Sequence, residues 1–156
     1  LGDVYKRQLL HRSLKTLEIR SIRQSETALK LANSLESKAH ELGLSRVIYP
    51  GLTSHPQHAM AARQMLNFGC VVSVEVKGDL ARVERILTST RYFHFAVSLG
   101  SVESLIQHPF SLTHAVVPED QKNDLGIGPQ LIRISVGLED PEDLEADLVQ
   151  ALMNSR

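Results

Sequence analysis

A long amphipathic helix is the feature that most constrains how this 156-residue chain can fold. From about Leu9 to Leu42, apolar residues recur at steps near three and four, which places them on one face of a helix. No proline interrupts this stretch, and Gly43 is a natural helix stop. A continuous helix over 9–42 would span about 50 Å, which is longer than a domain of about 156 residues needs. We therefore expect its beginning to pack against structure outside this chain. A bent helix or two helices is the alternative.

The residues before this helix differ from the rest in character. The chain does not begin with Met, and residues 1–8 are more polar than those that follow. We interpret 1–8 as a foreign or non-native leader and leave it out of the fold prediction. A native linker or helix start is the alternative.

Short strands and helices alternate after Gly43, in the stretch 43–156. In Val71–Lys77 every second residue is apolar, which predicts a strand with one buried and one wet face. Further strands are predicted at 46–49, 93–97 and 131–136, and helices after Ser54, Asp79 and Asp140. The stretch 98–128 is predicted to be mostly loop and short helix. The pattern predicts an α/β domain with a small mixed or antiparallel sheet and helices mainly on one face.

Composition excludes several classes of function. The formal net charge of −1 lacks the basic footprint of nucleic-acid or anionic-membrane binding, and no apolar run reaches the roughly 18 residues of a membrane span. The single cysteine, Cys70, cannot form an internal disulfide, which favours a reducing compartment, most simply the cytoplasm. His55 and His58 are too close in sequence for a helical zinc pair, so we expect no metal site.

Arg133 is the first candidate for chemistry. Within the predicted strand 131–136, apolar residues alternate with it, so its side chain projects from the face opposite to theirs. A guanidinium presents a planar fork that fits a carboxylate with two parallel hydrogen bonds. The alternative, which the pattern alone favours, is a structural salt bridge to Glu139 or Asp140.

Ser98 is the second candidate, because it follows the predicted strand 93–97 where a hydroxyl can be aimed into a cleft. Gly100 permits a tight turn there, and an ordinary turn is the alternative. The chain has no P-loop and no Gly-x-Ser-x-Gly elbow, and Gly126-Ile-Gly128 lacks the third glycine of a dinucleotide loop. A carboxylate clamp without a nucleophile or base is what a substrate-binding domain separated from its catalytic partner would look like.

Several longer motifs occur in a fixed order along the chain. They are Ser13-Leu-Lys-Thr-Leu17, Ile48-Tyr-Pro-Gly-Leu52 with Ser54-His-Pro-Gln-His58, Ala96-Val-Ser-Leu-Gly100, Glu103-Ser-Leu-Ile-Gln-His-Pro109, Thr113-His114 and Leu131-Ile-Arg-Ile-Ser-Val-Gly-Leu-Glu-Asp140. Together they resemble the C-terminal portion of the pyridoxal-phosphate-dependent enzymes of Cys/Met metabolism. That family includes cystathionine γ-synthase, the cystathionine lyases, methionine γ-lyase and O-acetylhomoserine sulfhydrylase. The resemblance covers nearly everything from about Leu9 to the end.

The resemblance implies a fold-type I enzyme that uses pyridoxal phosphate and is usually a homotetramer. The long helix would link the cofactor domain to the C-terminal domain, and the cofactor lysine would lie upstream of this chain. Arg133 matches the arginine that binds the substrate α-carboxylate. Ser98 matches a serine beside the cofactor lysine that helps place lysine and substrate, and Thr113 lies on a nearby loop.

Val97 is the residue from which the family resemblance implies a preferred substrate. Methionine γ-lyases often have Ala-Val-Ser-Leu-Gly, as at 96–100 here, whereas Glu or Tyr is common before the serine in the cystathionine enzymes. An apolar side chain suits a thioether better than a distal charged group. We therefore expect the parent to resemble methionine γ-lyase, which releases methanethiol, 2-oxobutanoate and ammonia, and we expect the fragment alone to be inactive. Ser13 and Ser101 depart from the family's usual residues, and Ser101 leaves the subfamily open.

Other functions remain as alternatives. Within the family they are cystathionine γ-lyase, cystathionine γ-synthase and O-acetylhomoserine sulfhydrylase. Outside it, the chain could be a non-catalytic binding or oligomerisation module whose apolar helix stripe serves a partner.

Overall fold

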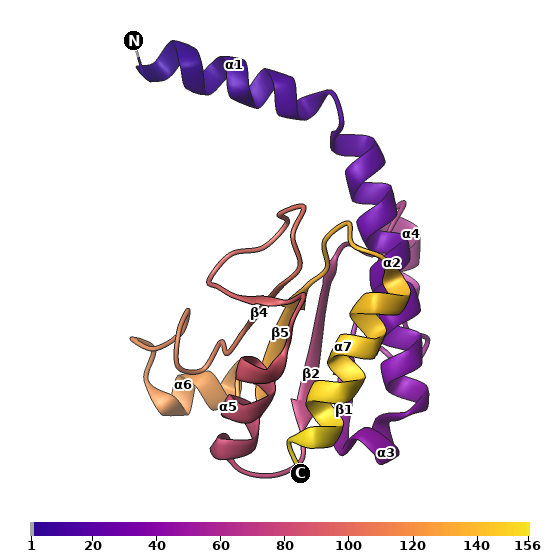
Figure 1. The fold of residues 1–156 in the computed structure, drawn as a ribbon, viewed down its shortest axis with the longest axis vertical. Helices are drawn as coiled ribbons and strands as arrows, with labels where there is room; N and C mark the ends of the chain where they lie inside the picture. The colour runs from indigo at the N-terminus through magenta and orange to yellow at the C-terminus, as the bar shows by residue number, and fades with distance from the viewer. Residues whose placement is uncertain (1) are drawn as a thin grey trace.

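A five-stranded mixed sheet forms the centre of residues 2–156, which a computed structural model of the chain describes (Figure 1). The strands are β1 (Leu44–Ile48), β2 (Val71–Val76), β3 (His94–Phe95), β4 (Leu105–Gln107) and β5 (Leu131–Ser135). Their order is β1-β2-β5-β4-β3, and neighbours are antiparallel except for the parallel pair β3 and β4. The predicted α/β fold with a mixed sheet is confirmed.

Helices cover mainly one face of this sheet. The helices are α1 (Gly2–Leu14), α2 (Leu17–Ser37), α3 (Ala39–Leu42), α4 (His58–Gln64), α5 (Leu80–Ser89), α6 (Glu119–Asp124) and α7 (Pro141–Asn154). Helix α7 packs against both α2 and α5, and Figure 1 shows it lying between them. The core joins alternate residues of β2 and β5, such as Val74 and Ile134, to buried leucines of the helices, such as Leu35 and Leu148. Removing this apolar surface from water is the main force that holds the layers together.

The helix predicted over 9–42 is not continuous. It is divided into the end of α1, all of α2 and α3, with breaks at Lys15-Thr16 and at Lys38. At the first break Arg20 donates from Nε to Thr16 Oγ1 at 3.2 Å and from Nη2 to the Ser13 carbonyl at 2.9 Å. Such local side-chain bonds compete with the helical ladder. The alternative of a bent or divided helix is therefore the one observed.

Helix α1 extends away from the sheet (Figure 1). It contains residues 2–8 of the predicted leader, while Leu1 lies outside the described residues. The apolar stripe predicted for this region is exposed at Leu10, Leu14 and Leu17 and becomes buried only further along α2.

Three of the predicted helix boundaries can be compared with the structure. Asp79 accepts a hydrogen bond from the backbone N–H of Arg82 at 3.0 Å and caps α5, and Asp140 accepts from that of Glu142 at 3.0 Å and caps α7. Ser54 does not cap α4, which begins at His58. Its hydroxyl donates instead to a carboxylate of α2.

The stretch 98–128, predicted to be mostly loop and short helix, contains helix α6 and also a strand that sequence periodicity did not indicate. Strand β4 is only three residues long, Leu105–Gln107, and all three are buried. A run this short shows no alternation that could distinguish it from a loop. It matters for function because it lies directly beside β5.

Candidate functional site

Strand β5 places Arg133 on the sheet face opposite to the packed core. Its cross-strand neighbours on that face are Ser73 of β2 and Gln107 of β4. The adjacent residues Ile132 and Ile134 are buried on the other side. The predicted alternation along this strand is confirmed, with Arg133 itself half-buried.

Two neutral groups hold the Arg133 guanidinium. Gln107 is buried, and with its amide oxygen toward Arg133 it accepts hydrogen bonds from Nε at 2.9 Å and from Nη2 at 2.8 Å. Arg133 Nη2 also donates to the backbone carbonyl of Ser98 at 3.1 Å. The structure therefore brings together Arg133 and Ser98, which the sequence placed 35 positions apart.

The alternative role of Arg133, a salt bridge to Glu139 or Asp140, is not observed. Among residues 2–156 the salt bridges join Arg7 to Asp3, Lys38 to Glu145 and Arg46 to Glu75. The Glu139 carboxylate instead accepts from the backbone N–H of Ser104 at 2.7 Å and from its hydroxyl at 2.8 Å. Asp140 caps α7.

Burial of Arg133, and the lack of an acid paired with it among residues 2–156, define the electrostatics of this site. Burial lowers the pKa of the Arg133 guanidinium from its ordinary value. An arginine still remains protonated at neutral pH, so the sheet face carries an oriented positive charge that its protein neighbours do not neutralise. A ligand carboxylate is the group that such a fork binds best.

The turn that carries Val97 and Ser98 is anchored to the same strand. Gly100 adopts φ +74°, and its N–H donates to the Ser135 hydroxyl at 2.9 Å. The Val97 side chain is 58% exposed. The apolar side chain of Val97 is therefore exposed on the turn whose Ser98 carbonyl contacts the Arg133 guanidinium.

Thr113, the remaining predicted site residue, lies in the segment between β4 and α6. It is exposed, and its Oγ1 lies 3.0 Å from Nδ1 of His114. Within the described part of the chain it makes no hydrogen bond to Arg133 or Ser98. Gln107, by contrast, belongs to the site but was not predicted, because its pairing with Arg133 depends on the unpredicted strand β4.

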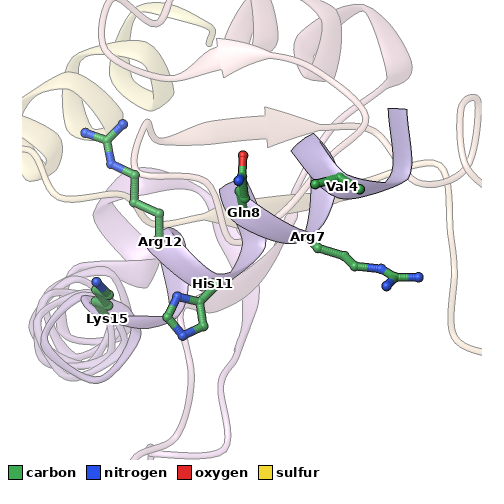
Figure 2. Close-up of a pocket in the computed structure, with 6 residues that line it drawn as sticks. All are labelled: Val4, Arg7, Gln8, His11, Arg12 and Lys15. Atoms are coloured by element: carbon green, nitrogen blue, oxygen red, sulfur yellow. The ribbon is translucent and has the colours of Figure 1, made fainter. Parts of the chain in front are cut away.

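A separate groove lies along α1 (Figure 2). It is lined by Val4, Arg7, Gln8, His11, Arg12 and Lys15, which come from one exposed stretch of helix and the break that follows it. It contains none of the residues around Arg133. Across residues 2–156, no group of three or more His, Cys, Asp or Glu side chains could hold a metal ion.

Comparisons with known proteins identify what the chain is similar to. Residues 2–153 match the family described as Cys/Met metabolism PLP-dependent enzyme. A cystathionine β-lyase of Coxiella burnetii is 48% identical over 90% of this chain and 36% of its own length. An L-methionine γ-lyase of Fusobacterium nucleatum subsp. polymorphum is 42% identical over 90% of this chain and 35% of its own length.

A solved structure agrees with these relatives. Cystathionine γ-synthase from Xanthomonas oryzae pv. oryzae, in complex with aminoacrylate and cysteine, superposes with a TM-score of 0.87 at 42% identity. The match covers 92% of this chain and 36% of that one. The chain thus spans a little over a third of the length of the proteins it resembles.

Proposed function

The chain belongs to the family of Cys/Met metabolism PLP-dependent enzymes, and we propose that it is the substrate-binding part of a carbon–sulfur lyase acting on sulfur amino acids. The observation that carries the proposal is Arg133, which is oriented by Gln107 and Ser98 and has no acid partner among the described residues. An amino acid presents the α-carboxylate that such a group binds.

Each predicted site residue has a role in this proposal. Arg133 would bind the α-carboxylate. Ser98, whose backbone carbonyl accepts a hydrogen bond from Arg133, would help place the substrate and the cofactor lysine. Val97 would contact the substrate side chain. Thr113 would complete the site in the full-length enzyme.

Pyridoxal phosphate, when bound by the whole enzyme, supplies an electron sink for carbanions. Lys38 Nζ is paired with Glu145 at 2.7 Å, Lys122 Nζ donates to the Phe110 carbonyl at 3.2 Å, and Lys15 is exposed at the break between α1 and α2. We propose that the cofactor lysine belongs to sequence outside this chain.

We propose methionine as the preferred substrate, which γ-elimination converts to methanethiol, 2-oxobutanoate and ammonia. The support is Val97, an exposed apolar side chain beside the carboxylate clamp, where a thioether loses little hydration. Cystathionine is the second candidate, because several similar proteins are cystathionine lyases.

The oligomeric state and the cellular location of the whole enzyme are also proposals. We propose that the whole enzyme is a cytoplasmic homotetramer in which the exposed apolar side chains of α1 and the start of α2 are covered. These include Leu10, Leu14, Leu17 and Ile22. The same exposed side chains could instead bind a partner protein, and they are the observation that supports the alternative of a binding module without catalysis. No helix in the described region is long and apolar enough to cross a membrane.

The test is a substrate panel on the full-length enzyme with pyridoxal phosphate. Release of 2-oxo acid would be measured with methionine, cystathionine and O-acetylhomoserine, and thiol release with the first two. We expect the highest kcat/KM with methionine. Preference for cystathionine would select the second candidate, and failure to turn over any of these amino acids would contradict the assignment as a lyase.

A further inference from the structure

One buried amide joins helix α2 to both segments that carry the proposed substrate groups. The Gln24 side chain is 4% exposed, and its Nε2 donates to the Ser101 carbonyl at 2.6 Å and to the Val136 carbonyl at 3.0 Å. Ser101 belongs to the turn that follows Ser98, and Val136 follows the strand of Arg133. Both hydrogens of the amide are therefore used.

The other anchors of this turn come from the end of β5 and the segment after it. Besides the bond from Gly100 to Ser135, the backbone N–H of Leu138 donates to the Val102 carbonyl at 2.8 Å. Gln24 differs from these because it reaches the turn from a helix. It therefore links the position of α2 to the position of the turn.

The chemistry at this point requires an amide or an equivalent double donor. Two backbone carbonyls face the side chain, so a carboxylate, which only accepts, would meet two acceptors. An apolar side chain of the same length would leave the buried Val136 carbonyl and the partly buried Ser101 carbonyl without this partner, which costs more than losing an exposed hydrogen bond.

We propose that Gln24 is a positioning residue for the carboxylate clamp. By holding the Ser101 carbonyl beside the end of β5, it fixes the turn that presents the Ser98 carbonyl to Arg133. The inference rests on the proposed function, since Gln24 acts through Arg133 and can affect substrate binding only if Arg133 binds a substrate carboxylate.

The test measures how strongly the full-length holoenzyme prefers a carboxylate. Norleucine and pentylamine differ by the α-carboxylate, and neither has a leaving group at Cγ, so both serve as competitive inhibitors. In Gln24→Met we expect the preference for norleucine over pentylamine to fall about tenfold, since one buried and one partly buried hydrogen bond are lost. The affinity for norleucine should fall and the KM for the substrate should rise, whereas kcat should change by less than about twofold.

Thr27→Val is the matched control. Thr27 lies on the same helix, is 1% exposed, and its hydroxyl has no hydrogen-bond partner in the described structure. We expect it to leave the preference unchanged. An unchanged preference in Gln24→Met would overturn the inference. A wild-type enzyme that does not distinguish the two inhibitors would instead contradict the proposed function.

Gln24→Glu provides a second variant if Gln24→Met does not fold. Burial raises the pKa of a carboxyl placed between two carbonyls, and its protonated form donates one hydrogen bond. We expect norleucine binding by this variant, relative to wild type at the same pH, to recover as the pH is lowered. A constant ratio across pH would contradict the positioning role.

Discussion

Arg133 and Gln107 face each other across strands β5 and β4, and the buried Gln107 amide accepts hydrogen bonds from the Arg133 guanidinium. Because Gln107 is neutral, it orients the guanidinium without cancelling its charge. This distinguishes the arrangement from a structural ion pair, in which the charge would already be satisfied.

Gln107→Leu removes this acceptor while keeping a side chain of similar size. We expect the full-length enzyme to show a KM for its amino-acid substrate raised about tenfold, because the charge-assisted hydrogen bonds that orient the guanidinium are lost. Steady-state kinetics would measure this. Ser73→Ala is the control, since Ser73 is the other cross-strand neighbour of Arg133 but makes no hydrogen bond to it in the described structure. Equal KM values in the two variants would contradict the role of Gln107.

Val97→Glu tests the basis of substrate choice. A negative charge on this exposed turn should disfavour the thioether of methionine and favour the distal ammonium group of cystathionine. We expect the ratio of kcat/KM for cystathionine to that for methionine to rise about tenfold. Leu99→Glu is the matched control, because Leu99 is 55% exposed on the same turn. If both variants change the ratio equally, the effect is general electrostatics and Val97 does not select the substrate.

Arg82 is predicted to be critical for stability rather than for binding. It is 6% exposed and donates to the carbonyls of Leu42 at 2.8 Å, Gly43 at 2.9 Å and Leu152 at 3.3 Å. It thereby satisfies the ends of α3 and α7. We expect Arg82→Ala to lower the free energy of unfolding in urea by about 3 kcal/mol, and Arg63→Ala, on an exposed face of α4, by less than about 0.5 kcal/mol. Similar losses in the two variants would contradict this.

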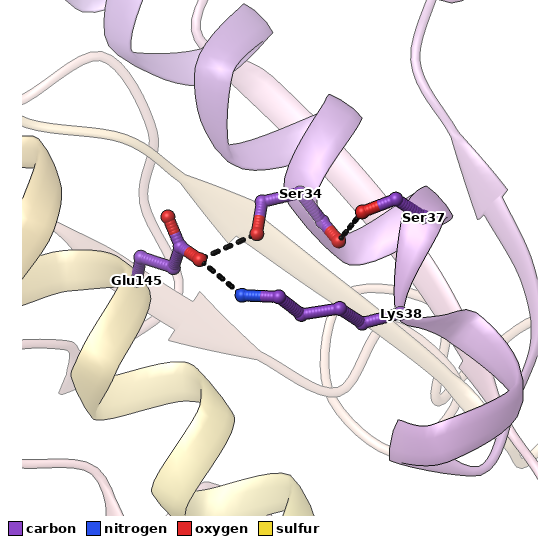
Figure 3. Close-up of polar contacts among 4 residues, drawn as sticks. All are labelled: Ser34, Ser37, Lys38 and Glu145. Atoms are coloured by element: carbon purple, nitrogen blue, oxygen red, sulfur yellow. Dashed lines mark hydrogen bonds and ion pairs between the residues drawn. The ribbon is translucent and has the colours of Figure 1, made fainter.

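The contact between α2 and α7 predicts a pH dependence of stability. Glu145 accepts from the Ser34 hydroxyl at 2.5 Å and from Lys38 Nζ at 2.7 Å (Figure 3). Hydrogen bonds from Lys38 and Ser34 lower the pKa of the Glu145 carboxyl. A carboxyl with a lowered pKa contributes stability above its unfolded-state pKa and loses that contribution as the pH falls through its folded-state pKa.

Glu145→Gln is therefore expected to destabilise the chain at neutral pH and to be nearly neutral in acid. The neutral-pH loss should be about 0.5 kcal/mol, because the pair is partly exposed and screened by solvent. Urea unfolding at both pH values would measure it, with Glu41→Gln, an exposed glutamate of α3, as the control. A loss that persists unchanged in acid would show that the charge of Glu145 is not its source.

Local sequence patterns were enough to predict much of the fold. The alternation in 71–77 and 131–136 reflects strands with one face against the core, and Asp79 and Asp140 cap helices by bonds that need only neighbouring residues. The break at Thr16 could not be predicted in the same way. The apolar periodicity runs through it, while the bonds of Arg20 that accompany it are polar and local.

The candidate site was only partly predictable for a related reason. Periodicity indicated the direction of Arg133, and the position of Ser98 after a predicted strand, together with the family resemblance, indicated Ser98. Gln107 contacts Arg133, and Gln24 contacts Ser101 and Val136, through pairings that arise only when β4 and α2 pack beside β5 and its turn. No local pattern distinguishes these glutamines from exposed ones.

The central claim is that Arg133 binds the α-carboxylate of an amino-acid substrate. Its most direct test is the kinetics of Arg133→Ala and Arg133→Lys in the full-length enzyme, with Arg63→Ala as the control. We expect kcat/KM to fall about a hundredfold in Arg133→Ala, mainly through KM, and less in Arg133→Lys, which keeps the charge but not the planar fork. A KM in Arg133→Ala equal to that of wild type would contradict the claim.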